Sequence, residues 1–230
     1  MPNPNLELLT AAAKLLGPLV DELVFVGGCA TGLLITEEAI ADVRPTVDVD
    51  AISEVTSYAA YENLSERLRA LGFKHDTSEG APLCRWLHSG IKVDVMPLDE
   101  SVLGFSNRWY ESAIATAQVY ELEDGLRIRI VTAPYFYATK LEAFKGRGAG
   151  DFVASHDLED LITVVDGRPQ LLDELQAAHA DVRAYIARET TTLLDSRQFL
   201  DALPGFLLPD AASQARVAGI MKTLNQIAAL

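Results

Sequence analysis

The hydrophobic and polar positions of the first half of the chain alternate between helical spacing and strand spacing. Leucines recur at helical spacing near the amino terminus, and a short apolar run then ends abruptly at Gly27-Gly28. A second run alternates valine with aspartate, which is the period-2 pattern of a strand with one buried face. The pattern predicts helix, strand, helix, strand and helix, in this order, over residues 6–16, 23–26, 30 onward, 47–52 and 58–71.

Two β-hairpins are expected next. Residues 83–88 and 91–96 are strand-like and are separated by the turn pair Ser89-Gly90. In the second of these strands Val93 and Val95 are expected to face the core, which leaves Asp94 on the exposed face. Residues 118–122 and 126–131 form a further antiparallel pair around the acidic turn at Asp124-Gly125.

The character of the chain changes at Pro134, which suits the start of a helix. Nearly everything after it has helical periodicity, with a break at Gly146 to Gly150 and a helix cap at Ser155. We therefore predict a core domain over residues 1–133 and a helical domain over residues 134–230. The expected fold class is α/β (α+β), a mixed sheet with flanking helices followed by a helical carboxy-terminal part.

Composition narrows the class of protein. The 230 residues are 49% hydrophobic, so they can form a sizeable core, and no apolar run is long enough to span a membrane. Two cysteines give no disulfide framework, and the amino terminus lacks the pattern of a signal peptide, so we expect a cytoplasmic protein. A formal net charge of -14 opposes broad binding to phosphate backbones. Any contact with nucleic acid should be local.

The segment R44-P-T-V-D-V-D50 brings two carboxylates together. Residues two apart on a strand point to the same face about 6.5 Å apart, so Asp48 and Asp50 are expected side by side while the valines enter the core. Two such acids repel each other unless a cation lies between them, and Mg²⁺ or Mn²⁺ suits carboxylate oxygens. With Asp94 as a third acid, the group could hold two metal ions for phosphoryl or nucleotidyl transfer.

The Gly27-Gly28 pair is placed where a phosphate could bind. A strand, two glycines and a helix start present backbone N–H groups and the positive end of a helix dipole to an anion. A tight turn without a ligand has the same sequence, and aspartates two apart also occur on the solvated face of a strand. The position of Gly28, 20 residues before Asp48, favours a triphosphate site. Thr46 could bind a phosphate or fix the strand.

These spacings resemble the signature of the DNA polymerase β-like nucleotidyltransferase superfamily, which has paired glycines, then spaced acids, then a third acid. The residues that match are Gly27, Gly28, Thr46, Asp48, Asp50 and Asp94. Together with P-Y-F-Y-A-T-K140-L-E-A-F and S-H-D157-L-E-D160-L downstream, the first segment is similar to AbiEii-type nucleotidyltransferases, many of which are toxins of bacterial toxin–antitoxin pairs. The resemblance spans residues 23–166.

The resemblance implies a nucleotidyltransferase that uses Mg²⁺ and a nucleoside triphosphate, with tRNA as a candidate acceptor and an antitoxin as a candidate partner. It implies that Gly27 and Gly28 form the phosphate turn and that Asp48 and Asp50 bind metal. It also implies that Lys140 binds nucleotide phosphate and that Asp157 belongs to a later acidic motif. Asp94 is expected to complete the metal cluster or to act as a base.

Three functional alternatives follow from the residues. An RNA acceptor needs local positive charge, which the sequence offers only as a modest group: Lys140, Lys145, Arg147, Arg127 and Arg129. A cationic small molecule such as an aminoglycoside suits the acidic balance of the chain better. A catalytically silent binding module with the same fold is the third alternative, although intact acids that repel without metal argue against it.

Overall fold

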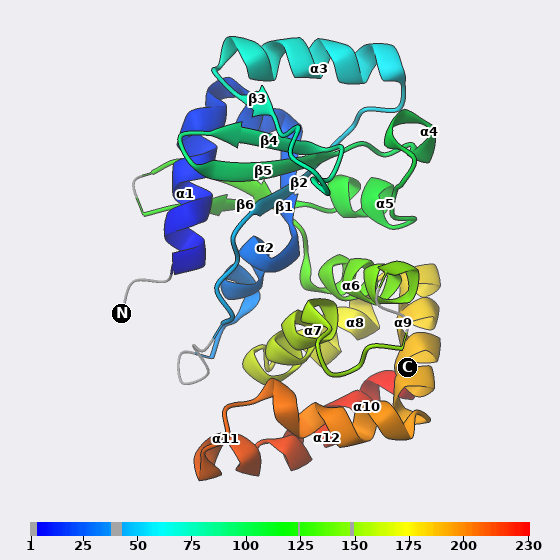
Figure 1. Ribbon diagram of the computed structural model, residues 1–230. Helices are drawn as coiled ribbons and strands as arrows, with labels where there is room; N and C mark the ends of the chain where they lie inside the picture. Colours follow the sequence, from blue (N-terminus) through cyan, green and yellow to red (C-terminus); the bar gives the residue numbers. More distant parts are fainter. Residues whose placement is uncertain (1–3, 38–42, 124, 148–149) are drawn as a thin grey trace. The chain divides into compact units, whose positions relative to one another are not determined.

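The computed structural model describes residues 4–37, 43–123, 125–147 and 150–230, which form two compact units (Figure 1). Unit 1 comprises residues 1–32 and 44–132, and unit 2 comprises residues 33–43 and 133–230. After the short segment 33–43, the chain returns to unit 2 at Ala133, one residue before the Pro134 at which the sequence changes character. Each unit is described by itself.

Within the described part of unit 1, seven strands form one mixed sheet in the order β3-β4-β5-β2-β1-β7-β6. The pairs β1–β7 and β2–β5 are parallel, and the other four pairs are antiparallel. The predicted α/β class is thereby confirmed. The strands are β1 (Leu23–Val26), β2 (Val49–Ser53), β3 (Lys74–His75), β4 (Arg85–His88), β5 (Ile91–Met96), β6 (Gln118–Glu121) and β7 (Arg127–Ile130).

Short and medium-length helices flank this sheet. Helix α1 packs against β2 and β5 through an apolar stripe that includes Leu9 and Leu16, both fully buried. Helix α3 begins at the cap Ser57, and its Tyr61 hydroxyl donates to the Val95 carbonyl over 3.3 Å. The helices of unit 1 are α1 (Pro4–Leu16), η1 (Gly17–Glu22), α2 (Gly27–Leu34, which ends in unit 2), α3 (Tyr58–Ala70), α4 (Glu100–Leu103) and α5 (Tyr110–Ala115).

Both predicted hairpins are confirmed. Strands β4 and β5 pair antiparallel across a two-residue turn in which Ser89 and Gly90 have φ values of 51° and 82°. Positive φ at both turn residues gives the twist that suits a two-residue hairpin. The turn fixes the register, so that Arg85 lies opposite Asp94. Strands β6 and β7 form the second hairpin, although Asp124 in its turn lies outside the described residues.

Three details differ from the sequence prediction. The predicted strand at 47–52 begins only at Val49, and Val47 is 73% exposed rather than part of the core. Helix α2 begins at Gly27 instead of Ala30. Asp94 is not on an exposed face, since only 6% of its surface is accessible. The Arg85 guanidinium on the neighbouring strand β4 binds both carboxylate oxygens of Asp94 and covers it.

Unit 2 is built from helices, as the periodicity beyond Pro134 predicts. Ser155 caps α7 by accepting a hydrogen bond from the Leu158 N–H, while the predicted break at 146–150 falls partly outside the described residues. The helices are α6 (Ala133–Arg147), α7 (His156–Gly167), α8 (Leu171–Ala177), α9 (Ala180–Leu194), α10 (Arg197–Ala202), η3 (Leu203–Phe206), α11 (Ala211–Ala215) and α12 (Val217–Ala228).

Residues 33–37 join unit 2 through contacts that the sequence did not indicate. The backbone N–H groups of Thr36 and Glu37 both donate to the Gly167 carbonyl, over 2.9 and 3.1 Å. A Cβ atom at Gly167 would lie 2.8 Å from the side chain of Ile35, so only glycine allows this approach. In the described ranges, no helix combines the length and apolar character needed to cross a bilayer.

Candidate active site

Three of the predicted site residues lie in unit 1 around one row of the sheet. Asp50 on β2 lies in register with Asp94 on β5, and Asp94 lies opposite Arg85 on β4. Directly paired residues share a face of the sheet, so these side chains project from the same side. Asp48 immediately precedes β2 and is two residues from Asp50. The predicted gathering of acids is therefore present.

Arg85 lies among these acids and was missed by the sequence prediction. Its Nε donates to Asp94 Oδ1 over 2.8 Å, and its Nη2 donates to Asp94 Oδ2 over 2.7 Å and to Asp48 Oδ2 over 2.6 Å. The side chains of Arg85, Asp48 and Asp94 are only 15%, 23% and 8% exposed. Hydrogen bonding to Asp94, followed by the charges of Asp94 and Asp48, raises the pKa of Arg85 well above its usual value, so the guanidinium stays charged.

Thr46 and Asn5 fix the segment that carries Asp48. The Thr46 hydroxyl donates to Asp48 Oδ1 over 3.0 Å. Asn5, a buried residue of α1, accepts from the Thr46 backbone N–H and donates to the Arg44 carbonyl, each over 2.9 Å. The two Asp48 oxygens thus have separate donors, Thr46 and Arg85. Asn5 was not a predicted site residue, because no local pattern connects it to a loop about 40 residues away.

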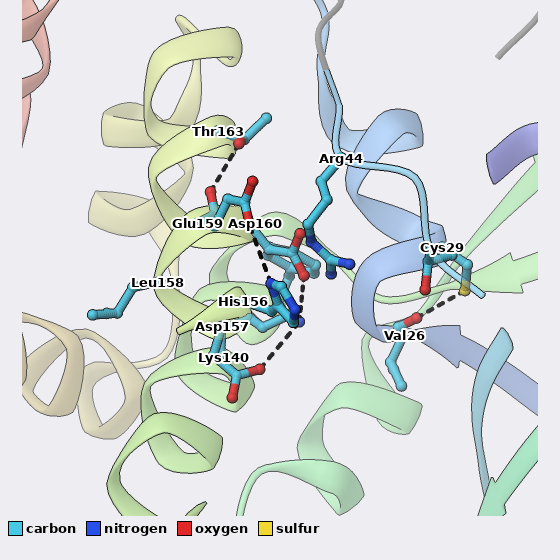
Figure 2. A network of polar contacts seen from close by, with 12 residues as sticks. Val26, Cys29, Arg44, Lys140, His156, Asp157, Leu158, Glu159, Asp160 and Thr163 are labelled. Atoms are coloured by element: carbon cyan, nitrogen blue, oxygen red, sulfur yellow. Dashed lines mark hydrogen bonds and ion pairs between the residues drawn. The ribbon is translucent and has the colours of Figure 1, made fainter. Parts of the chain in front are cut away.

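Gly27 and Asp50 meet at the turn between β1 and α2. Gly27 has a φ of +68°, and a Cβ atom placed on it would lie 2.0 Å from Asp50 Oδ2. Gly28 is buried in the first turn of α2, and Figure 2 shows the Cys29 thiol directed at the Val26 carbonyl, 3.0 Å away. The Asp50 carboxylate therefore lies directly beside the glycine turn, at the start of helix α2.

The carboxylates can be compared with what a divalent ion requires. Within the described ranges, no group of three or more acidic, histidine or cysteine side chains is arranged to hold a metal ion. Asp94 has both oxygens on the Arg85 fork. Each carboxylate oxygen of Asp48 keeps a second lone pair, and Mg²⁺ often uses one or two carboxylates together with substrate phosphates and water. Asp94 holds Arg85, which leaves Asp48 and Asp50 as the acids to be tested as metal ligands.

Lys140 and Asp157 lie in unit 2, where they form a buried cluster with Asp160 (Figure 2). Lys140 Nζ, on α6, donates to Asp157 Oδ1 over 3.2 Å and to Asp160 Oδ2 over 2.6 Å, both on α7. The three side chains are 9%, 7% and 2% exposed. Two acids flank one ammonium, which orients Lys140 firmly.

Three residues of the basic group expected for RNA have partners of their own. Lys140 is buried between acids, and Lys145 pairs with Glu189 at 3.0 Å. Arg129 donates to the Ile114 carbonyl over 3.0 Å. The side chain of Arg147 lies outside the described residues.

Cys84 lies beside the acids but is not suited to nucleophilic chemistry. It is 3% exposed, and burial, with smaller effects of the Asp94 and Asp50 charges, raises its thiol pKa to about 12. A thiol reacts as its thiolate, which is scarce at neutral pH under these conditions. The polar chemistry of the site therefore belongs to its acids and to Arg85.

Comparison with known proteins gives similarities of overall structure only. No family model matches the chain, and no curated protein matches it. An antigenic nucleotidyltransferase-like protein from Paracoccidioides brasiliensis has 19% identity and a TM-score of 0.49, with 86% of this chain and 92% of that one covered. A candidate nucleotidyltransferase from H. pylori has 13% identity and a TM-score of 0.46, with 98% and 90% covered. JHP933 from Helicobacter pylori has 13% identity and a TM-score of 0.45, with 97% and 87% covered.

Proposed function

We propose that this chain is a nucleotidyltransferase that moves a nucleoside monophosphate from a nucleoside triphosphate to a hydroxyl group. The observation that supports this most directly is the approach of Gly27 to Asp50, with Asp48 two residues away. A glycine that is held at positive φ against a carboxylate, at the start of a helix, places an acid beside the first helical turn, where backbone N–H groups and the helix dipole favour an anion. A triphosphate with its metal ion has the charges that this combination requires.

In the proposed reaction the acceptor oxygen attacks the α-phosphorus, the bond from that phosphorus to the bridging oxygen breaks, and pyrophosphate leaves. The hydroxyl proton passes to solvent. Gly27 and Gly28 bind phosphate oxygens through their backbone, and Thr46 orients Asp48 through its hydrogen bond to Oδ1. Arg85 holds the other oxygen of Asp48 and is itself held by Asp94. Asp94 therefore acts as a positioning residue.

Asp48 and Asp50 are the residues that would bind Mg²⁺ or Mn²⁺. When bound, the ion would offset the charge that develops on the phosphate oxygens and the leaving group. From unit 2, we propose that Lys140 binds the nucleotide phosphates, as the resemblance implies, and that Asp157, in the later acidic motif, orients the nucleotide or the acceptor. The buried pairing of Lys140 with two acids favours a fixed orientation over a mobile surface role.

For the acceptor we propose RNA, with the acceptor end of tRNA as the first candidate, in the role of a toxin whose cognate antitoxin restrains it. A cationic small molecule such as an aminoglycoside is the second candidate. Two observations favour the second: the net charge of -14, and the pairing of Lys140 and Lys145 with acids. Either acceptor supplies the hydroxyl that the reaction needs.

The test is an incubation of the purified protein with each α-labelled nucleoside triphosphate and MgCl₂, together with total tRNA or an aminoglycoside panel. We expect label to appear in one acceptor, and the Asp50→Asn variant to give none. Cellular expression completes the experiment, since a toxin should arrest growth and leave tRNA with added nucleotides that mass measurement detects. Label in neither acceptor, with a folded protein, counts against the proposal.

Calorimetry separates the enzyme from a silent binding module. The proposed enzyme should bind a nucleoside triphosphate in the presence of Mg²⁺, and the heat should disappear in the Asp50→Asn variant. No binding of any nucleotide at millimolar concentration would favour the silent module. Binding that is unchanged by Asp50→Asn would place the nucleotide elsewhere.

A further inference from the structure

A second polar feature of unit 1 lies beyond the acids, at the free end of the β4–β5 hairpin. A hollow of about 530 Å³ is lined by residues of the hairpin, of β3 and of the loop before it. Three of them, Lys74, His88 and Lys92, can carry positive charge, and none of the lining residues is acidic. Lys74, His88 and Lys92 were not among the predicted site residues.

The sheet register places the two lysines in one row. Lys74 pairs with Leu87, and Leu87 pairs with Lys92, so the three residues share a face across β3, β4 and β5. Lys92 is two residues from Asp94 and Leu87 is two residues from Arg85, on the same strands. The lysine row therefore lies on the same face as the acidic row, about 6.6 Å from it along the strands.

The charge balance of the hollow is unusual for this chain. Two of its six lysines line one hollow in a protein of net charge -14. No ion pair of Lys74 or Lys92 occurs among the described residues. Two residues after Lys74, the Asp76 carboxylate accepts from the backbone N–H and hydroxyl of Ser78 over 3.0 and 2.5 Å. Hydrogen bonds from Ser78, ahead of smaller effects of Arg85 and Lys92, lower the pKa of Asp76.

The backbone around the hollow is open at Gly90, where nothing lies within 4 Å of a Cβ position, whereas at Gly72 the His88 Nε2 lies 3.1 Å from that position. Gly72 and Gly90 both line the hollow and have φ values of 92° and 82°. The His88 ring packs edge-on against Phe73, and its Nδ1 lies 2.9 Å from the Ser89 hydroxyl. Ammonium groups, an imidazole and exposed backbone form a surface that suits a phosphate group.

The order of the strands separates this hollow from the proposed triphosphate turn. Gly27 follows β1, on one side of β2, whereas the lysine row crosses β5, β4 and β3 on the other side. A triphosphate at Gly27 and an anion at the hollow would thus lie on opposite sides of the acid pair. An acceptor that is to attack at the acids must approach from the side that the triphosphate leaves open.

We infer that the hollow lined by Lys74, His88 and Lys92 binds a backbone phosphate of an RNA acceptor and guides its hydroxyl toward Asp48 and Asp50. The inference rests on the proposed function, because the acids must be the reaction site for the RNA hydroxyl to be guided toward them. It specifies RNA as the class of acceptor. It also replaces the basic group that the sequence suggested with a different one. A small cationic acceptor would be repelled here.

Binding of a short, labelled single-stranded RNA without nucleotide tests the inference independently of catalysis. The variant Lys74→Gln/Lys92→Gln is compared with Lys14→Gln/Lys222→Gln, which removes the same charge from exposed lysines elsewhere. The measured quantity is the slope of log binding constant against log salt concentration. In the lysine variant the magnitude of this slope should fall by about 0.7 for each RNA phosphate that is no longer neutralised. The control should keep the wild-type slope, and the fluorescence of Trp86 checks that β4 is intact.

Four outcomes decide the matter. A shallower slope in the first variant alone supports the hollow, even if no transfer activity is found, in which case only the proposed reaction fails. Equal slopes in both variants overturn the inference, as does an absence of RNA binding by the wild-type protein at low salt. A loss of nucleoside triphosphate affinity with unchanged RNA binding would assign the hollow to the nucleotide and overturn it as well.

Discussion

Replacing Gly27 with alanine tests the contact on which the proposed site depends. Two costs are expected. An alanine at a φ of +68° adopts a left-handed backbone, which costs roughly 1–2 kcal/mol. Its Cβ would also lie 2.0 Å from Asp50 Oδ2, so the Asp50 carboxylate must leave its position. Forcing that side chain away from a preferred rotamer adds about 0.5–1.5 kcal/mol.

Gly17→Ala is the matched control, because Gly17 has a φ of +53° and open space within 4 Å. It should show the backbone cost alone. Urea unfolding followed by tryptophan fluorescence measures both variants in unit 1, since Trp86 and Trp109 are the two tryptophans of the chain. Gly27→Ala should therefore be less stable than Gly17→Ala by about 0.5–1.5 kcal/mol.

Activity should separate the two variants further. A displacement of about 1 Å in a reacting group lowers the rate roughly 10²-fold, so Gly27→Ala should lose at least that much transfer activity while Gly17→Ala keeps it. In an Asp50→Ala background the two closest atoms, at 2.0 and 2.7 Å, are gone, and the excess cost of Gly27→Ala should shrink. Equal effects of Gly17→Ala and Gly27→Ala on stability and activity would refute the reasoning.

Three further predictions concern the acids and their surroundings. Asp48→Asn should lower transfer at least about 10²-fold at unchanged circular dichroism, and wild-type activity would show that the metal assignment is wrong. Arg85→Met should lower the free energy of unfolding of unit 1 by roughly 2–4 kcal/mol, because it leaves the carboxylates of Asp48 and Asp94 without their shared cation. Adding Asp94→Asn to this variant should recover part of the lost stability, and no recovery would contradict the pairing. Because the thiol pKa of Cys84 is about 12, this residue should resist iodoacetamide at pH 8 until the protein unfolds, and rapid alkylation of native protein would contradict its burial.

The part of the fold that could be predicted from the sequence is the part with strong local periodicity. The hairpin at Ser89-Gly90 followed from turn chemistry, and β1 followed from an apolar run that ends at glycine. Asp94 was misplaced because a period-2 pattern shows that two faces differ, without showing that one is solvated. The burial of Asp94 depends on the cross-strand contact with Arg85, which the pattern of one strand does not contain.

Arg85 could have been found by the same reasoning that found the hairpin. A two-residue turn at Ser89-Gly90 requires residues 88 and 91 to pair, and counting outward places residue 85 opposite residue 94. An arginine directly across from an aspartate is a favourable cross-strand pair. The contact of Asn5 with Thr46 had no such signal, because α1 and the loop at 44–46 meet only through the packing of the whole unit.

Arg85 also changes how the acids are to be interpreted. Acids that repel without metal argue for an enzyme, but Arg85 already offsets the repulsion between Asp48 and Asp94, so those two are equally at home in a structural ion pair. Such a pair does not require a left-handed glycine pressed against Asp50. That contact carries a backbone cost at Gly27 and fixes a carboxylate beside a helix start, which is the combination that the proposed triphosphate site uses. The proposed function therefore depends on Asp50 and Gly27 more than on the number of acids in the row.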